Sequence, residues 1–337
     1  MISFTEFFDC KGIHVWNILS DRAIDHIFTS TKEIPIAEHV QKEVTGIAVL
    51  LPYRLISGTE SSTHTKIVTV GSFAAYNYYH FLTRILQELA AKIRAEYGLH
   101  RSDIRISVNS KLPEKESAVL ANLGWIGKSG LLVNPLYGSA VLIGLMLFPK
   151  IDALFQTLVN ETDSKNYINN SQCGSCSACI DACPTHALDN GFSKHLCLQY
   201  WMSTGGMPEH FKLHRGNHLY GCDVCIKECP YTQQFQDNER LEHQKGQLGD
   251  SGQWEGEQGK HREHRGHSSK VFTYLESQLK ESEKRPGSYL PLELLAGMSI
   301  LELKNYFKGT ALGFRWIPLN DFKEYMRFLC ESERMTT

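Results

Sequence analysis

The cysteines of this chain have a spacing that suits metal chemistry. Eight of the ten lie between Cys173 and Cys229 in a chain of 337 residues, and this clustering indicates metal binding rather than a disulfide framework. The first run has the spacing Cys-x2-Cys-x2-Cys-x3-Cys-Pro and comprises Cys173, Cys176, Cys179, Cys183 and Pro184. The second has the spacing Cys-x2-Cys-x3-Cys-Pro and comprises Cys222, Cys225, Cys229 and Pro230. The first spacing is that of a bacterial ferredoxin loop, in which three thiolates bind one iron–sulfur cubane and the fourth binds another.

The cysteine count predicts two 4Fe–4S clusters. Two cubanes need eight thiolates, and the runs supply four and three, because Leu219 stands where the second run would have a leading cysteine. Cys197, between the runs, is therefore the predicted eighth ligand. By the crossing rule, the first cluster is predicted to take Cys173, Cys176, Cys179 and Cys229. The second is predicted to take Cys183, Cys197, Cys222 and Cys225.

The alternative for this array is a pair of zinc sites, which also use sets of four cysteines. Two CxxxCP runs favour 4Fe–4S clusters over zinc. A pair of such clusters would transfer electrons at low reduction potential. Cys10 and Cys330 are isolated in sequence, and we interpret them as ordinary thiols.

Composition predicts a globular protein without a membrane segment. Apolar residues make up 42% and charged residues 21%, and the formal net charge of −2 argues against nucleic-acid binding through a general electrostatic field. The first sixteen residues lack the pattern of a signal peptide, and the longest apolar stretch, 138–148, is about half of what spans a bilayer. We expect a cytoplasmic protein with reduced thiols.

The sequence before the cysteine array alternates between strand and helix patterns, which predicts an α/β domain over residues 1–164. Expected strands are 46–53, 104–108, 131–133 and 139–148, and expected helices are 77–97 and 113–122. Loops at the carboxyl ends of such strands form the expected ligand crevice.

Three further segments follow the α/β domain. Residues 165–235 are predicted to form a ferredoxin-like domain with two clusters, and 270–337 a small helical C-terminal segment that is clearest over 290–307. Residues 236–269 carry almost no aliphatic side chains and are predicted to be a mobile polar insertion. Its histidines are interpreted as solvated rather than metal-binding; they are His243, His261, His264 and His267.

Several stretches resemble the epoxyqueuosine reductases, the cobalamin-dependent iron–sulfur enzymes of queuosine biosynthesis in tRNA. The matching stretches are 77–93, 122–139 (NLGWIGKSGLLVNPLYGS), 173–188, 216–231 and 290–312. They occur in family order, and a wider relation extends to the reductive dehalogenases. The resemblance implies a nitroreductase- or dehalogenase-like α/β domain that binds base-off cobalamin beside the two clusters. It also implies tRNA as a partner and an electron donor such as a flavodoxin or ferredoxin.

The resemblance assigns cofactor-binding roles to positions on both sides of the array. The matching residues are Tyr79, His80, Trp125, Gly127, Lys128 and Ser129, with Asp223 between cluster ligands and Tyr200 and Ser203 after Cys197. Two of them have plain alternatives, because Trp125 can be a core residue and Lys128 a solvated charge.

One position departs from the family pattern. The family carries an aspartate after the strand that precedes the GWIGK loop, and this aspartate is its proposed proton donor. Here Asn109 occupies that position, and an amide has no proton to give at neutral pH. Either another acid serves (Tyr79, Glu114 or a water held by Asn109), or the substrate differs, or the chain is a paralogue with another reductive task.

Three functions therefore stay open. The first is a cobalamin-dependent reductase acting on a modified tRNA nucleoside, with Tyr79 and the Asn109 position at the reaction site. The second is a corrinoid reductase of a small molecule such as an organohalide or epoxide, for which Tyr76, Tyr78 or Tyr79 would suit as proton donor. The third is a two-cluster electron carrier without catalysis.

Overall fold

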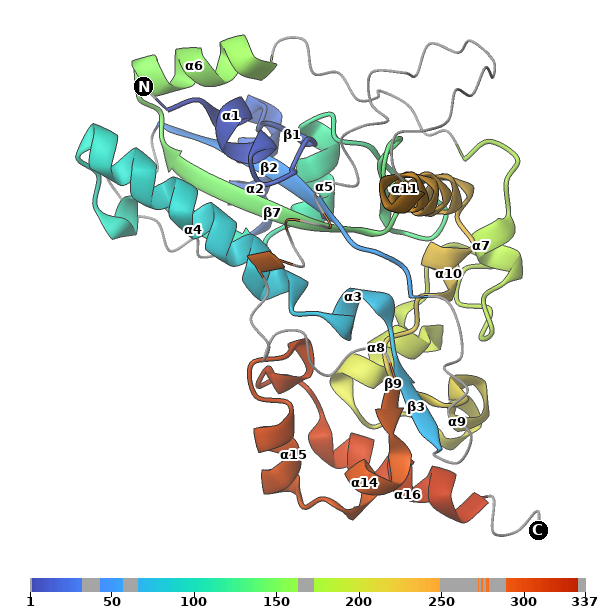
Figure 1. Ribbon diagram of the computed structural model, residues 1–337. Helices are drawn as coiled ribbons and strands as arrows, with labels where there is room; N and C mark the ends of the chain where they lie inside the picture. The colour runs from blue at the N-terminus through green and yellow to red at the C-terminus, as the bar shows by residue number, and fades with distance from the viewer. Residues whose placement is uncertain are drawn as a thin grey trace.

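The computed structural model describes most of the chain. The described residues are 2–31, 43–56, 66–162, 173–248 and 289–332, together with Phe272, Tyr274, Ser277 and Gln278. They form an α/β unit, a smaller sheet with the C-terminal helices, and a loop-rich segment with the cysteines between them (Figure 1). Among these residues, no helix has the length and apolarity needed to cross a bilayer.

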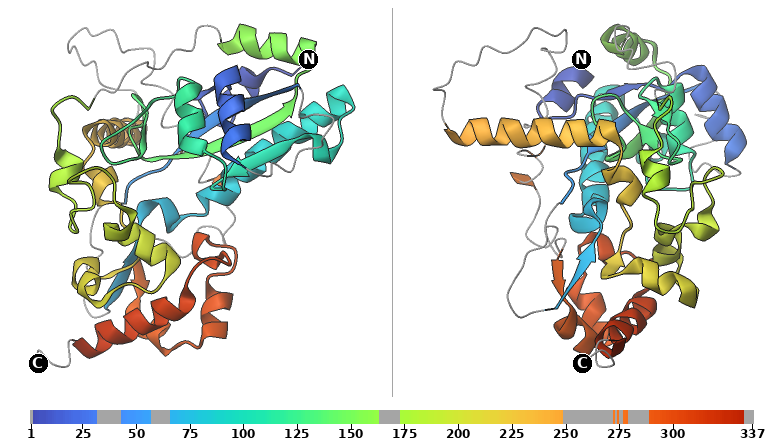
Figure 2. Two further views of the ribbon diagram at one scale, coloured as in Figure 1. Left: turned by 180° about the vertical axis from the view of Figure 1, so that it is seen from behind. Right: turned by 90° about the vertical axis from the view of Figure 1, so that its right-hand side faces the viewer.

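The main sheet has the strand order β1-β2-β7-β4. These strands are β1 (Trp16–Ile18), β2 (Val44–Pro52), β7 (Val141–Pro149) and β4 (Arg105–Val108). Eight of the nine β2 residues are buried, as the continuous apolar run predicts for a strand covered on both faces. Helix α4 (Tyr78–Tyr97) covers one face, and α2 (Asp21–Ser30) and α5 (Glu114–Leu120) lie on the other (Figures 1 and 2).

The direction of the strands corrects the expected position of the crevice. Every neighbouring pair in this sheet is antiparallel, with Pro52 opposite Val141 and Val108 opposite Gly144. Strands β2 and β4 therefore end at the edge where β7 begins. The crevice prediction is right for the carboxyl ends of β2 and β4 but wrong for β7, because an antiparallel strand brings its amino end to that edge.

Close packing holds α4 on the sheet. A side chain at Gly144 would lie 2.9 Å from Leu86 and 3.1 Å from Leu82, so β7 has room there only for a glycine beneath the helix. The apolar stripe predicted for this helix is buried; it consists of Phe81, Leu82, Ile85, Leu86, Leu89 and Ile93. Helices α1 (Phe4–Asp9) and α6 (Asp152–Thr162) complete this unit.

A second sheet lies in the lower half of Figure 1 and has the order β8-β3-β9. Its strands are β8 (His218–Tyr220), β3 (Ile67–Val70) and β9 (Tyr289–Pro291), with β3 parallel to β8 and antiparallel to β9. Strand β3 and α3 (Ser72–Ala75) fall within the range 1–164, but β3 pairs with strands from later in the chain. The predicted boundary at 164 therefore does not separate the two sheets.

The second core packs around this sheet. Its helices are α8 (Leu198–Thr204), α9 (Glu209–Arg215), α14 (Leu292–Gly297), α15 (Ile300–Tyr306) and α16 (Leu319–Ser332). The predicted helical stretch 290–307 is interrupted after α14. Ser299 accepts a hydrogen bond from the Glu302 N–H, and the Glu302 carboxylate accepts one from the Ser299 N–H, a capping box that starts a new helix.

Short elements carry the cysteine segment. They are the hairpin of β5 (Trp125–Ile126) and β6 (Leu132–Val133), and helices α7 (Ala178–Asp181), α10 (Val224–Lys227) and α11 (Pro230–Leu248). Single 3-10 turns are η1 (Arg101–Asp103), η2 (Lys194–Leu196) and η4 (Ala311–Gly313).

Helix α11 corrects the predicted insertion 236–269. Its residues 236–248 are helical, and the buried Gln236 side chain donates to the Tyr53 carbonyl and accepts from the Leu55 N–H. These two hydrogen bonds anchor a stretch whose only aliphatic residues are two leucines but which is rich in good helix formers. His243 lies in this helix, whereas His261, His264 and His267 lie outside the described residues.

We predict that Gly221→Ala destabilises the junction before the second cysteine run. Gly221 has φ of 90°, and an added Cβ would lie 2.7 Å from the Cα of Gly71. Backbone strain alone predicts a loss of about 1–3 kcal/mol in the free energy of unfolding. Gly297→Ala is the matched control, because its Cβ meets no described atom within 4 Å. Equal urea midpoints of the two variants, measured anaerobically by circular dichroism, would contradict this account.

Candidate metal centres and the adjoining crevice

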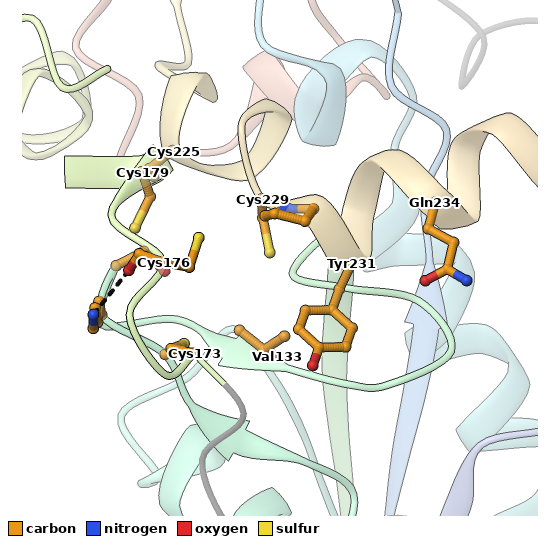
Figure 3. A pocket seen from close by; sticks show the side chains of 12 residues that line it. Val133, Cys173, Cys176, Cys179, Cys225, Cys229, Tyr231 and Gln234 are labelled. Atoms are coloured by element: carbon orange, nitrogen blue, oxygen red, sulfur yellow. Dashed lines mark hydrogen bonds between the residues drawn. The ribbon is translucent and has the colours of Figure 1, made fainter. Parts of the chain in front are cut away.

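Five cysteines from both runs line one cavity of about 370 Å³. They are Cys173, Cys176, Cys179 and Cys229, which are the four predicted for the first cluster, and Cys225. The loop before α7 brings Cys173 and Cys176, α7 itself brings Cys179, and the turn into α11 brings Cys229. Figure 3 shows the labelled sulfurs of Cys176, Cys179 and Cys229 around a shared space, with Tyr231 and Val133 on its other side. The structure thus brings together the residues predicted for the first cluster.

A second cavity of about 310 Å³ gathers the other four thiols. Its walls include Cys183, Cys197, Cys222 and Cys225. Cys225 lines both cavities, so the two cysteine sets adjoin. Among the described residues, no three His, Cys, Asp or Glu side chains are close enough to hold a single metal ion. A single metal ion needs ligands that converge on one point. Thiols that surround a cavity suit a larger group such as an iron–sulfur cluster.

The electrostatics of the thiols follow the same grouping. Burial raises the pKa of Cys222 to about 11 and that of Cys225 to about 12, and the negative charges of neighbouring thiolates add to each shift. The pKa of Cys179 is raised by burial first and then by Cys173, Cys229 and Cys176. Bound metal must therefore compensate both the burial and the mutual repulsion of the thiolates.

The residues of the β5–β6 hairpin lie at the first cavity. The buried Trp125 ring donates its Nε1–H to Cys173 Sγ at 3.5 Å. A side chain at Gly127 would lie 2.8 Å from a Val133 methyl group and in ordinary contact with Cys173 Sγ at 3.5 Å, so the hairpin backbone packs closely here against Val133 and beside the cysteine. Lys128 Nζ donates to two backbone carbonyl oxygens of the cysteine loop. Trp125 is thus buried beside a thiol, and the exposed Lys128 is bonded to this loop rather than simply solvated.

A smaller cavity of about 160 Å³ adjoins the second one. It contains three of the predicted proton-transfer residues, Tyr79, Asn109 and Glu114. The two cavities share Tyr79, Leu131, Ser139, Val141 and Leu142. Together they form a crevice (defined here as these two cavities) at the sheet edge where β2 and β4 end. The predicted second-cluster cysteines stand at one end of this crevice and Glu114 at the other.

Glu114 holds the loop that carries Asn109. Its carboxylate accepts hydrogen bonds from the Asn109 N–H at 3.1 Å, the Ser110 N–H at 2.9 Å and the Ser107 hydroxyl at 2.8 Å. Asn109 has φ of 54°, a left-handed conformation that asparagine tolerates. Burial raises the pKa of Glu114, and these hydrogen bonds oppose that shift. The Tyr79 hydroxyl also has a raised pKa, first through burial and then through Tyr220 and Glu114, so it stays protonated.

Other predicted residues lie away from the crevice. The His80 side chain is exposed. Tyr200 packs edge-on against His195 and Trp201, and Ser203 accepts a hydrogen bond from Gln199. Asp223 is buried with its carboxylate bound by the Ser72 N–H and hydroxyl and by Lys227. None of these four lies among the residues that line the cavities described above, whereas Ser129 lines both cysteine cavities.

Sequence reasoning missed several lining residues. Tyr53 lines the second cavity, and burial followed by the Asp223 charge raises its pKa. It ends the predicted strand 46–53, so its place at a carboxyl end was a usable signal. Gln199 lines the same cavity and accepts from the Cys222 N–H at 3.0 Å, but no motif marks it.

Comparisons with known proteins agree with this arrangement. Residues 172–232 match the family described as "4Fe-4S double cluster binding domain". The epoxyqueuosine reductase of Lactococcus garvieae is 32% identical over 198 residues, which cover 57% of this chain and 52% of that protein. The chain is similar to epoxyqueuosine reductases. It spans about half the length of the curated relatives it matches.

Solved structures extend the similarity to the fold. The epoxyqueuosine reductase from Streptococcus thermophilus superimposes with a TM-score of 0.61 at 17% identity, covering 96% of this chain and 78% of that chain. An epoxyqueuosine reductase in complex with an epoxyqueuosine-modified tRNA stem loop gives 0.61 at 19% identity, covering 95% and 78%. The resemblance predicted from the motifs is thereby confirmed, together with a double-cluster domain.

We predict that the thiols act in the two crossed sets. Cys229→Ala should weaken the same electron paramagnetic resonance signal as Cys173→Ala, and Cys183→Ala the same signal as Cys222→Ala. Each variant should retain about four of roughly eight irons per chain. Cys10→Ala, which removes a thiol outside both cavities, is the control and should retain all of them. Pairing of signals within each sequence run, rather than across the runs, would contradict the assignment.

Proposed function

We propose that this chain is a cobalamin-dependent iron–sulfur oxidoreductase that reduces epoxyqueuosine to queuosine in tRNA. The observation that carries the proposal is the crevice, in which four thiols and the proposed proton-transfer residues line adjoining cavities. The similarity to epoxyqueuosine reductases, one of which was solved with a modified tRNA stem loop, supports this substrate class. A cytoplasmic location and a flavodoxin or ferredoxin as electron donor belong to the same proposal.

Beside the cysteines, the second cavity has an uncharged and mostly apolar wall that would contact the face of a bound cobalamin ring. Its walls carry no charged side chain among the residues that line it, and aromatic and aliphatic groups dominate; these include Phe73, Leu131, Val141, Leu142 and Phe192. Cobalamin bound there would supply a strongly reducing cobalt centre. The nitroreductase- or dehalogenase-like description of the α/β domain is part of this proposal.

The residues of the chain would supply position, electrons and protons. Removal of an epoxide oxygen as water consumes two electrons and two protons. The eight proposed ligands would hold the clusters that deliver the electrons; these are Cys173, Cys176, Cys179, Cys229, Cys183, Cys197, Cys222 and Cys225. Tyr79 faces both cavities of the crevice, and its protonated hydroxyl would donate a hydrogen bond to the substrate oxygen.

We propose Glu114 as the proton donor in place of the aspartate that Asn109 replaces. Glu114 and Asn109 line the same small cavity, and burial raises the pKa of the Glu114 carboxyl toward the range of a useful acid. Asn109 would then position the substrate through its amide. This division of roles requires the Asn109 loop to stay bound to Glu114, as the three hydrogen bonds provide.

One observation favours a second candidate function. The uncharged wall of the second cavity also suits a small apolar substrate such as an organohalide, for a corrinoid reductase without tRNA. The two candidates share the cofactors and differ only in the substrate, so tRNA affinity distinguishes them.

Anaerobic reconstitution tests the proposed function. Purified protein incubated with hydroxocobalamin should contain about eight irons and show a base-off cobalt signal in electron paramagnetic resonance. It should convert epoxyqueuosine in a tRNA anticodon stem loop, and its affinity for that RNA should fall as salt is added. Cobalamin binding without RNA affinity would instead support the small-molecule reductase. Zinc at the cysteines would overturn both.

Glu114→Gln should lower turnover by about 10²–10⁴-fold, the range of a lost general acid. In the wild type, turnover should fall as pH rises through the raised pKa of Glu114, because only the protonated carboxyl donates. Glu116→Gln on the same helix is the control, since Glu116 is exposed and lines none of the cavities. Asn109→Asp should restore part of the activity of Glu114→Gln. A pH profile unchanged by Glu114→Gln would refute the assignment.

A further inference from the structure

The first cysteine set receives a side-chain hydrogen bond at sulfur. Trp125 Nε1–H donates to Cys173 Sγ at 3.5 Å, within the range of N–H···S contacts. The indole is buried and held edge-on by the Tyr231 ring, with centroids 5.2 Å apart and planes at 77°. Tyr231 itself lines the cavity of the first cysteine set, so both rings stand at the same thiols. The donor is therefore fixed in place.

A cation binds the same cysteine loop. Lys128 Nζ donates to the carbonyl oxygens of Gly174 and Cys176, each at 2.8 Å. The ammonium group thus lies over the segment that connects two thiols. Trp125 and Lys128 both come from the β5–β6 hairpin, so one short element brings a donor and a positive charge to one cysteine set.

The second cysteine set has different surroundings. Its cavity has no charged side chain among its lining residues, and Cys183 accepts from the backbone N–H of Ala187 at 3.3 Å. A tryptophan also stands on the helix that follows Cys197, but the Trp201 Nε1–H donates to the His195 carbonyl oxygen at 2.8 Å. An indole of the same chemistry is thus directed to an oxygen rather than to a sulfur.

We propose that Trp125 and Lys128 are positioning residues that raise the reduction potential of the cluster bound by the first cysteine set. Hydrogen bonds to ligand sulfurs and nearby positive charge favour the reduced cluster, which carries one more negative charge. The step concerned is the uptake of one electron by the oxidised cluster, with no bond made or broken. Trp125 has the larger effect because it is buried, whereas solvent screens the exposed Lys128 ammonium. The inference rests on the proposed cluster ligands and not on the substrate.

A redox titration with dithionite, followed by electron paramagnetic resonance, tests the proposal. At a fixed potential, Trp125→Phe should lower the ratio of reduced to oxidised first cluster roughly tenfold, which is 59 mV for one electron. Lys128→Met should lower it less, and the difference from wild type should shrink in high salt. The second cluster should keep its potential in both variants.

Two matched variants serve as controls. Trp201→Phe removes an indole donor that bonds a carbonyl, and Lys323→Met removes an ammonium donor bonded to the Met298 carbonyl oxygen; both should leave the first-cluster potential unchanged. If Trp125→Phe titrates like wild type while it retains about eight irons, the inference fails and the cluster assignment stands. If the wild type binds no iron, both fail.

If Trp125→Phe does not fold, a measurement on the unsubstituted chain still tests the contact between Trp125 and Cys173. With ¹⁵N-indole tryptophan incorporated, the reduced first cluster should show a nitrogen coupling in pulsed resonance spectra, and this coupling should persist in Trp201→Phe. Absence of the coupling, or its loss in Trp201→Phe, would overturn the contact.

Discussion

The fold must hold eight cysteine sulfurs in two adjoining, partly buried cavities, although these sulfurs repel one another when they are ionised to thiolates. Burial, together with the charges of neighbouring thiolates, raises the pKa of Cys179, Cys222 and Cys225, so thiolates form at these three positions only against a bound positive group. The part of the chain that carries the two cysteine runs, 173–184 and 222–230, is rich in loops and contributes one large buried apolar side chain, Ile226, to the described cores. Its geometry therefore depends on metal and on contacts supplied by the two sheets.

Those contacts come from opposite sides. The α/β unit reaches the first cysteine set through the β5–β6 hairpin, with Trp125 and Lys128 bonded to the loop. The segment after β3 reaches the second set through Ser72, whose N–H and hydroxyl both donate to the buried Asp223 carboxylate. Hydrogen bonds to a charged group contribute about 1.5–3 kcal/mol each, enough to orient a loop that has little core of its own. The placement of β3 in the second sheet thus positions Ser72 beside the second cysteine set and also contributes to the C-terminal core.

The local parts of this architecture could be predicted from the sequence, and the non-local parts could not. Ligand spacing, the apolar stripe of α4 and the buried run of β2 are patterns within one segment, and each is found in the structure. The antiparallel order of the main sheet and the pairing of β3 with β8 and β9 depend on partners far along the chain, which periodicity does not record. Composition also misjudged α11, because one buried glutamine anchors a helix that has almost no aliphatic residues.

The site divides in the same way. The crossed cysteine sets follow from spacing, whereas the roles of Trp125 and Lys128 depend on which neighbour each side chain meets. Motif matching gave the hairpin a cofactor role, but the contacts connect it to the first cysteine set. Asp223 sits between ligands in sequence and still points away from the cavity, because a buried carboxylate turns to the donors available to it.

In the proposed function, the crevice would separate the source of electrons from the source of protons. Thiols of the second set stand at one end, and Glu114 stands at the other with Tyr79 between. A low-potential centre in direct contact with a proton donor would reduce protons instead of the substrate. A reductase therefore needs the two groups to stay apart until the substrate lies between them. On this view the replacement at Asn109 changes which side chain carries the proton while leaving it on the same side of the crevice, since Asn109 and Glu114 are joined by a hydrogen bond.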